Sequence, residues 1–261
     1  MTDGITVVKL GGSTLGQHDT SLDDIAALHA EGERFVIVHG GGGTVTQWLE
    51  LHGIESTFVG GLRATDGRAL EVVVAVLAGL VNKQLVAELL ARGSLALGFS
   101  GADGAILRAR RYDAELGFVG EIVSLDGGTL LAASEAGVVP VLAPIAIEVE
   151  GEALRPQLLN VNADTVAGEV ASALAAERLV FLTDVAGVLD GTGELLPRLS
   201  AKEARRLLED GTVTEGMIPK VEAGVRASAT GVTTLIADGR EAGALRALLA
   251  ADGEAVATRI R

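Results

Sequence analysis

Short apolar runs rich in β-branched residues alternate along the chain with longer amphipathic stretches. Residues 5–10 (ITVVKL) and 34–39 (RFVIVH) predict buried strands, and residues 20–32 between them predict a helix that begins at Thr/Ser and ends at glycine. Further strands are expected at 95–99, 138–144, 178–189 (leaving through a turn) and 232–239, and further helices at 66–92, before Gly137, and at 160–176, 200–210, 216–231 and 241–253. This alternation predicts an α/β fold with a parallel sheet.

Three segments depart from the simple alternation. Residues 53–65 predict a loop, and Gly79 is expected to bend the long helix over 66–92. Residues 105–111 and 118–125 alternate in the manner of two paired strands, so we expect a hairpin laid on the sheet edge. No repeat or proline-rich linker divides the chain, which predicts one continuous sheet shared by any lobes.

Composition narrows the class of protein. The 261 residues include no cysteine, which excludes disulfides and thiolate metal sites, and the first residues lack the pattern of a targeting segment, so a cytoplasmic protein is expected. The most apolar stretch, residues 72–81, is shorter than the ~20 residues of a membrane span and predicts a buried helix. A net charge of −14 without clustered basic residues argues against a nucleic-acid partner.

Lysine is rare in this chain, so its positions are informative. Only four of the 21 basic residues are lysines, and Lys9 ends a strand directly before Gly11 and Gly12. Ligands of open α/β sheets bind beyond the carboxyl ends of the strands. Amides freed by the two glycines and the Lys9 ammonium could therefore hold phosphate, although a tight turn with a solvated lysine explains the same residues.

A second glycine cluster, HGGGGTV, follows the strand at 34–39. Four glycines between a strand and a helix favour an anion cradle at the helix N-terminus over a flexible turn. The cluster lacks the lysine of a Walker loop and has Val45 where the dinucleotide motif needs glycine. His39 has no other histidine at metal-ligand spacing and is interpreted as a core or turn residue.

Two further clusters carry charge at strand ends. Arg63 precedes a helix that Thr65 or Asp66 can cap. Its planar guanidinium could bind a carboxylate with two hydrogen bonds, or it could lie on the surface. Asp164 lies in the first turn of a helix, where an acid needs no functional explanation, whereas Lys220 lies in a first turn, where a cation is disfavoured. Lys220 is therefore the better functional candidate of the two.

One apparent motif is rejected. The stretch GFSGA nearly matches a hydrolase nucleophile elbow at Ser100, but alanine replaces its last glycine, and every histidine precedes the serine. The hydrolase order of Ser, Asp and His is therefore impossible.

Eight stretches in order, KLGGS, VIVHGGGG, GLRATD, LAGLVNKQLV, GFSGADG, NVNADTVAG, LTDVAGVLDG and GMIPKVEAGVRA, resemble the acetylglutamate kinase branch of the amino-acid kinase family. The resemblance covers nearly the whole chain. It implies a three-layer αβα sandwich with a mostly parallel central sheet, an N-terminal lobe (1–180) for amino-acid binding and dimerisation, and a C-terminal lobe (181–261) for ATP. It also implies ATP-dependent phosphorylation of the γ-carboxylate of N-acetyl-L-glutamate in arginine biosynthesis.

The resemblance also implies roles for individual residues. Lys9 and Lys220 match the lysines that hold the transferring phosphoryl group, and Asp164 matches the carboxylate that orders them. Arg63 matches the clamp on the substrate's α-carboxylate, and Asn160 matches a contact to its amino-acid portion. Gly11, Gly12, Gly41 and Gly42 match amides that face phosphate and substrate, and the last two are assigned to the substrate. The nucleotide pocket corresponds to Asp184, Val185, Ala186, Gly187, Val188, Leu189, Thr212, Val213 and Thr214.

The implied chemistry suits these residue types. A carboxylate nucleophile with a reference pKa of about 4.3 is ionised at neutral pH and needs no general base. The barrier is the approach of an anion to a polyanion, which two lysines and oriented amides relieve. Mg²⁺ is expected on the nucleotide phosphates and water, so we expect no protein metal ligand.

Two rival functions remain open, together with the assembly. One rival is a kinase for carrier-bound α-aminoadipate in lysine synthesis; GLRATD resembles the free-substrate enzymes, and the acidic surface suits an acidic carrier poorly. The other is a non-catalytic amino-acid or nucleotide sensor, for which two lysines and an aspartate are superfluous. Because the first strand begins near Ile5, we expect no N-terminal helix of the kind that links arginine-inhibited hexamers in some family members. The resemblance then implies a homodimer through the helix at 66–92, without that form of arginine inhibition.

Overall fold

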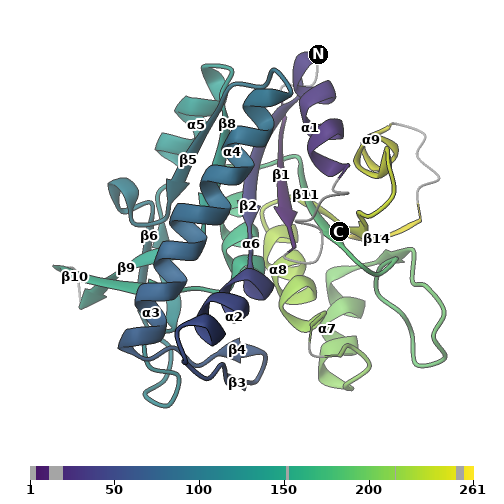
Figure 1. Cartoon of the computed structure of the whole chain (residues 1–261). Helices are drawn as coiled ribbons and strands as arrows, with labels where there is room; N and C mark the ends of the chain where they lie inside the picture. Colours follow the sequence, from purple (N-terminus) through teal and green to yellow (C-terminus); the bar gives the residue numbers. More distant parts are fainter. Residues whose placement is uncertain (1–3, 12–19, 151–152, 215, 251–255) are drawn as a thin grey trace.

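The computed structural model describes residues 4–11, 20–150, 153–214, 216–250 and 256–261. An eight-stranded sheet runs through the molecule with helices on both faces (Figure 1). Its strand order is β12-β14-β13-β11-β1-β2-β8-β5. The strands are β1 (Ile5–Leu10), β2 (Arg34–His39), β5 (Ala96–Ser100), β8 (Val139–Ala143), β11 (Arg178–Thr183), β12 (Arg198–Leu199), β13 (Thr233–Asp238) and β14 (Ala257–Ile260).

The sheet is mostly parallel, as predicted. Six adjacent strands run parallel to one another, in the order β13, β11, β1, β2, β8 and β5. Strand β14 is antiparallel to β13. β1 lies in the middle, paired with β2 on one side and with β11 on the other. Later strands lie on both sides of β1, with β2 and β8 on one side and β11 and β13 on the other. In open α/β sheets, ligands bind beyond the carboxyl ends of the strands at such a change in strand order.

Helices form two layers around the sheet and confirm the predicted αβα sandwich. One core contains residues of α5 (Gly128–Glu135), α6 (Ala163–Ala173), α7 (Ala201–Glu209) and α8 (Ile218–Ser228). The opposite core contains residues of α1 (Ser21–Ala30), α2 (Gly42–Leu51), the long helix after residue 66, and α9 (Ala244–Leu249). Within β1, Val7 packs into the first core and Val8 into the second, because side chains alternate between the faces of a strand. Lys9 therefore points to the α6 and α8 side.

The long helix is a composite of three segments, α3 (Gly67–Val74), the π-helical segment η1 (Ala75–Val81) and α4 (Asn82–Ala91). In place of a bend at Gly79, seven residues around it take the wider π turn. By length and composition this 25-residue helix could cross a membrane, with a mean hydropathy of 1.7 over its most apolar 18 residues, of which 44% are buried in the structure. The ten-residue stretch on which the length argument was based is thus only part of a longer helix. Its stripe of Val72, Val76, Leu85 and Leu89 packs into the second core.

Two sheet elements correct the sequence prediction. The expected hairpin forms between β6 (Leu107–Arg111) and β7 (Gly120–Leu125), but it belongs to a separate four-stranded sheet in the order β10-β9-β6-β7. The prediction missed β9 (Ile145–Glu150) and β10 (Ala153–Asn160) because no helix separates β8 from them. The expected loop over 53–65 contains a two-stranded hairpin, β3 (Phe58–Val59) and β4 (Leu62–Arg63), turning at Gly60 and Gly61.

Candidate active site

Lys9, Asp164 and Lys220 form a connected charge cluster at the carboxyl end of β1. Lys9 Nζ lies 2.8 Å from Asp164 Oδ1, and Lys220 Nζ lies 3.0 Å from Asp164 Oδ2. Lys220 Nζ also donates to the Gly216 carbonyl at 2.9 Å. Each of the three side chains is at most 12% exposed. One carboxylate thus spaces two ammonium groups that come from different elements, and the cluster carries a net positive charge.

Close packing of two helices brings this cluster together. α6 begins at the Asn162 cap, whose Oδ1 accepts from the Asp164 and Thr165 amides, and this places Asp164 in the first turn. One turn later, a Cβ added at Gly168 would lie 2.8 Å from Ala223 Cβ on α8. Glycine is therefore required for the approach of the helices that lets Lys220 reach Asp164. α8 starts at Ile218 with a proline in its first turn, as predicted.

The two lysines keep Asp164 ionised. Burial alone would raise the pKa of this carboxyl, but the charges and hydrogen bonds of Lys9 and Lys220 outweigh it, so the pKa lies below its ordinary value of 3.8. At neutral pH the Asp164 carboxyl is therefore ionised. A phosphoryl group beside it would meet two ammonium groups already held in place.

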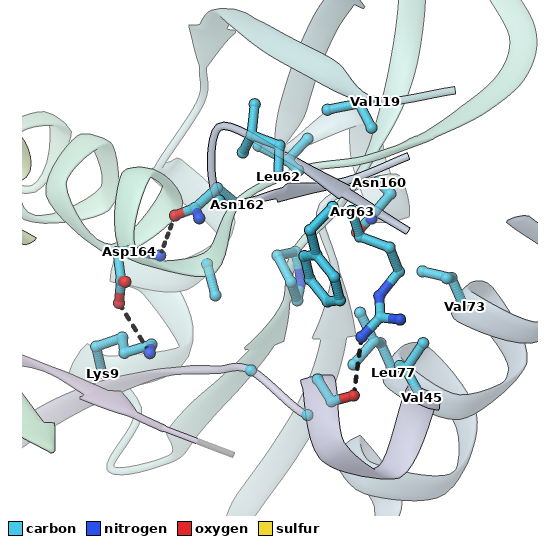
Figure 2. Close-up of a pocket in the computed structure, with 18 residues that line it drawn as sticks. Lys9, Val45, Leu62, Arg63, Val73, Leu77, Val119, Asn160, Asn162 and Asp164 are labelled. Atoms are coloured by element: carbon cyan, nitrogen blue, oxygen red, sulfur yellow. Dashed lines mark hydrogen bonds and ion pairs between the residues drawn. The ribbon is translucent and has the colours of Figure 1, made fainter. Parts of the chain in front are cut away.

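A first cavity, of about 190 Å³, opens beside Lys9 and Asp164 (Figure 2). Figure 2 shows this ion pair at one end and Arg63 at the other, with the apolar side chains of Val73, Leu77 and Val119 along the Arg63 end. The cavity is lined by Lys9, Gly40, Gly41, Gly42, Val45, Phe58, Gly61, Leu62, Arg63, Val73, Leu77, Val119, Pro144, Asn160, Val161, Asn162, Ala163 and Asp164. Cations thus mark both ends of a small, partly apolar space.

Arg63 is a buried cation without a carboxylate partner among the described residues. Its guanidinium donates to the Gly42 carbonyl and to Thr46 Oγ1, both at 3.0 Å, and to the Ser56 hydroxyl, and it lies 4.6 Å above the Phe58 ring. Burial lowers the pKa of Arg63 below its usual range, because the buried charge has lost its hydration and no anion in the described part of the chain replaces it. This Arg63 environment is suited to a carboxylate ligand.

Glycine is required at the N-terminus of α2. Gly41 caps the helix with φ +150°, and an added Cβ would lie 2.8 Å from Leu77 Cδ2. Gly42 tolerates a Cβ, which would lie 3.8 Å from the Arg63 guanidinium. The first amides of a helix have no partner within it and favour negative charge. Of the residues that carry these amides, Gly42 lines the first cavity, as does the cap residue Gly41.

A second cavity, of about 440 Å³, has Lys220 in its lining. The turn after β11 and the segment before α8 form its walls, with Thr183, Asp184, Val185, Gly187, Val188, Leu189, Asp190, Gly193, Thr212, Val213, Thr214, Gly216, Met217 and Lys220 as its lining. Every wall residue thus comes from the chain after β11 begins, whereas the first cavity is lined by residues 9–164. The Asp164 carboxylate joins the two cavities.

The structure brings most of the sequence-predicted residues to these two cavities. Ala186 lies in the predicted turn but does not line the second cavity, Gly11 is buried after β1 outside both linings, and Gly12 lies outside the described residues. Sequence reasoning missed Phe58 beneath Arg63, although the Gly60-Gly61 pair between short apolar runs is a hairpin signal. It also missed that Asn162, which caps α6, lines the first cavity.

Within the described residues, no three His, Cys, Asp or Glu side chains are arranged to hold a metal ion. Asp164 is committed to two lysines. The donor set of the cluster is therefore that of an anion site.

Comparison with known proteins identifies the family of this chain. Residues 4–238 match the family model described as the amino acid kinase family. The chain is 45% identical over 238 residues to a protein named acetylglutamate kinase from Dehalococcoides mccartyi, a match that covers 91% of this chain and 88% of that protein. A second protein of that name, from Acidiphilium cryptum, is 45% identical over 251 residues, with 90% of this chain and 82% of the other covered.

A solved structure extends the comparison to the fold. The N-acetylglutamate synthase of Neisseria gonorrhoeae, complexed with coenzyme A and N-acetyl-glutamate, is 26% identical with a TM-score of 0.82, and the match covers 98% of this chain and 59% of that one. The family model and the named relatives span most of the chain. This chain belongs to the amino acid kinase family, in its acetylglutamate kinase branch.

Proposed function

We propose that this chain transfers the γ-phosphoryl group of ATP to the γ-carboxylate of N-acetyl-L-glutamate, giving N-acetyl-L-glutamyl 5-phosphate in arginine biosynthesis. The observation that carries the proposal is the position of Asp164. Its two oxygens pair with Lys9 of the first cavity and Lys220 of the second. A phosphoryl group that passes between two bound substrates needs positive charge at their junction.

The reaction requires no proton transfer at the nucleophile. A γ-carboxylate oxygen attacks the γ-phosphorus, the bond from that phosphorus to the β-phosphate bridging oxygen breaks, and ADP leaves with the bond's electron pair. Lys9 and Lys220 neutralise charge that spreads over the transferring group, and Asp164 holds both ammonium groups in position. The absence of a histidine from the described cavity linings agrees with a nucleophile that is already ionised.

The first cavity suits N-acetylglutamate in the placement of its charges. Arg63 would bind the α-carboxylate, and the γ-carboxylate would lie toward Lys9 at the opposite end. Asn160, at the end of β10, lines the same space and donates to Thr65 Oγ1 at 3.3 Å, so its amide is oriented for the amino-acid portion. The amides of Gly41 and Gly42 would face the substrate. The resemblance assigns Gly11 and Gly12 to phosphate.

The second cavity suits a nucleotide. Val185, Leu189 and Met217 give it apolar surface for a base, and Lys220 places positive charge at the end nearest Asp164. Mg²⁺ would be carried by the nucleotide phosphates and water and would neutralise part of their charge. We propose ATP and Mg²⁺ on these grounds and name no protein ligand to the metal.

The two cavities are lined by different parts of the chain, and we propose two lobes that correspond to them. We propose that residues 1–180 bind the amino acid and dimerise, and that residues 181–261 bind ATP, with both lobes sharing the main sheet through β11. A cytoplasmic homodimer would form through the helix Gly67–Ala91, whose outward positions include Ala75 and Gly79. Sedimentation should give a dimer, whereas a hexamer would contradict this assembly.

Trapping of the acyl phosphate with hydroxylamine tests the function. The purified chain is incubated with ATP, Mg²⁺ and hydroxylamine, and N-acetylglutamate is compared with glutamate, aspartate and α-aminoadipate. Hydroxamate from N-acetylglutamate alone is the expected result. Lys220→Ala, which removes one charge of the cluster, should abolish most of the signal, while Lys202→Ala, an exposed lysine of α7, serves as the matched control.

The same experiment distinguishes the rivals. No hydroxamate from any free amino acid, with ATP still bound, would favour a carrier-bound α-aminoadipate substrate or a non-catalytic sensor. The named relatives and the pairing of both lysines with Asp164 support the free-substrate kinase instead.

A further inference from the structure

A buried histidine lies directly beneath the glycine cluster of the first cavity. His39 ends β2, is fully buried, and lines neither cavity. Its Nδ1 lies 2.8 Å from the carbonyl oxygen of the next residue, Gly40, and its Nε2 lies 3.2 Å from Asn82 Nδ2. The proposed reaction does not use this imidazole, yet both of its ring nitrogens have partners.

Asn82 fixes which ring nitrogen of His39 carries the proton. Its Nδ2 also lies 2.9 Å from the Val141 carbonyl oxygen and 3.3 Å from the Phe99 carbonyl oxygen, so its two hydrogens are shared among three acceptors, and its Oδ1 accepts from Lys83 Nζ at 2.9 Å. The ammonium contact identifies Oδ1 as the amide oxygen, so Nδ2 is the atom facing His39. A donor facing Nε2 requires an unprotonated Nε2, and the neutral ring then carries its hydrogen on Nδ1, aimed at the Gly40 carbonyl.

The surroundings maintain this neutral state. Burial, followed by the charges of Lys83 and Lys9, lowers the pKa of His39 from 6.5 to about 4, against the opposing effect of the Gly40 hydrogen bond. Gly98 of β5 makes room for the network, because an added Cβ would lie 1.9 Å from Asn82 Oδ1 and 2.5 Å from Lys83 Nζ. The arrangement thus depends on β2, β5, β8 and α4 together.

The hydrogen bond to Gly40 determines the direction of the next amide. In a trans peptide the carbonyl and the N–H point in opposite directions, and the described residues contain no cis peptide bond. A Gly40 carbonyl held toward buried His39 turns the Gly41 N–H away from the core. Gly41 lines the first cavity, and among the described residues no acceptor for its N–H is found.

We propose that His39 is a positioning residue, which orients the Gly40–Gly41 peptide so that the Gly41 N–H faces the bound acyl substrate, and that Asn82 holds the required tautomer. The π-helical segment supports the same glycine from behind. An added Cβ at Gly41 would lie 2.8 Å from Leu77 Cδ2 and 3.3 Å from Val81 Cγ2, so these side chains limit movement of the turn. As to substrate, the inference rests on the proposed function.

Two substitutions separate the orienting bond from packing. In His39→Asn the side-chain amide nitrogen takes the place of Nδ1 and can still donate to the Gly40 carbonyl. In His39→Gln the amide nitrogen takes the place of Nε2, so that bond is lost. We expect His39→Gln to lower kcat/KM for N-acetylglutamate about tenfold with the Kd for ATP unchanged, and His39→Asn to recover most of it. Both are assayed well below their melting temperatures.

The outcomes decide the proposal. Equal impairment of both variants would assign His39 to packing alone, and full activity of both, or impairment of His39→Asn only, would also overturn the positioning role. A second measurement needs no turnover: ¹⁵N chemical shifts of the His39 ring in the wild-type chain should report a protonated Nδ1 and a bare Nε2 at neutral pH. If N-acetylglutamate is not a substrate, the proposed function fails, while the reverse tautomer or an imidazolium would overturn the positioning role by itself.

Discussion

The two cavities differ in how their chemistry is held. In the first, Lys9, Arg63 and Asp164 are each less than one-tenth exposed and are fixed by ion pairs or hydrogen bonds. In the second, Val185 is 41% and Leu189 44% exposed, and Lys220 is the charged side chain tied into the cluster. The acyl substrate would therefore meet charges placed in advance, whereas a nucleotide would meet a surface defined mainly by shape.

This difference determines how the energy is distributed. A preorganised buried charge contributes strongly at one position because water does not screen it and no reorganisation is needed. Apolar contacts on a half-exposed wall contribute in proportion to the area that they cover. Single substitutions should therefore have large and specific effects in the first cavity and at its junction, and small effects in the second.

The largest effect is expected at the junction. Lys9→Ala or Lys220→Ala should lower kcat by on the order of 10²–10³ with a modest change of KM, because each removes one charge that stabilises the transition state. Steady-state kinetics with N-acetylglutamate and ATP measure this. Lys202→Ala should leave kcat unchanged. An unaltered kcat in either cluster variant would remove that lysine from the mechanism.

The next effect is on the stability of the fold, and it comes from His39 beneath the first cavity. The pKa of His39 is about 4 in the folded state against 6.5 in the unfolded state, so the unfolded state binds the proton first as the pH falls. The free energy of unfolding should therefore decrease between about pH 6.5 and pH 4, by about 3 kcal/mol from this residue alone. Denaturant titrations across that range, compared between wild type and His39→Asn, measure the difference.

Other groups do not obscure this comparison. Asp164 has a pKa below 3.8 in the folded chain, so the stability that it contributes is retained until the pH falls lower still. The remaining carboxylates are shared by both proteins and cancel in the difference. Parallel pH profiles for wild type and variant would show that His39 is not the buried neutral group described here.

Arg63 should give an intermediate effect confined to one substrate. Arg63→Ala should raise KM for N-acetylglutamate roughly 10- to 100-fold, through loss of a charge-assisted bidentate contact, and leave KM for ATP unchanged. Arg63→Lys keeps the charge but not the planar guanidinium, so its KM for N-acetylglutamate should lie between that of the wild type and that of Arg63→Ala. Arg68→Ala, on the exposed side of α3, is the matched control. Weakened ATP binding instead would contradict the clamp.

The contrast between the cavities also explains how far the sequence could predict this protein. β1, β2, β11 and β13 were predictable because they are continuous apolar runs, as strands buried on both faces must be. Lys9 and Lys220 could be singled out because a lysine at such a strand end or against a helix dipole is unusual, whereas Asp164 lies where the dipole favours an acid and was assigned from the resemblance alone. The pairing of all three through one carboxylate was not predictable, since it depends on the close approach of α6 and α8 at Gly168.

Other features depend on contacts that no local pattern encodes. In the four-stranded sheet, β6 pairs with β9 although their partner residues, such as Arg108 and Ile147, are 39 positions apart, and no pattern in either strand indicates the pairing. His39 was interpreted as a core or turn residue, and its burial confirms the core, but its contact with Asn82 comes from another element and was not predictable. The π turn of η1 was not predicted, since Gly79 indicated a bend instead.

The smallest effect is expected on the wall of the second cavity. Leu189→Ala should raise KM for ATP about fivefold and leave kcat and KM for N-acetylglutamate unchanged, because it removes part of a half-exposed apolar surface worth about 1 kcal/mol. Leu154→Ala, at a similar exposure of 48% on β10, lines neither cavity and should change nothing. An effect of Leu189→Ala as large as that of Lys220→Ala would mean that nucleotide binding also depends on one anchor, and the difference between the two cavities would not hold.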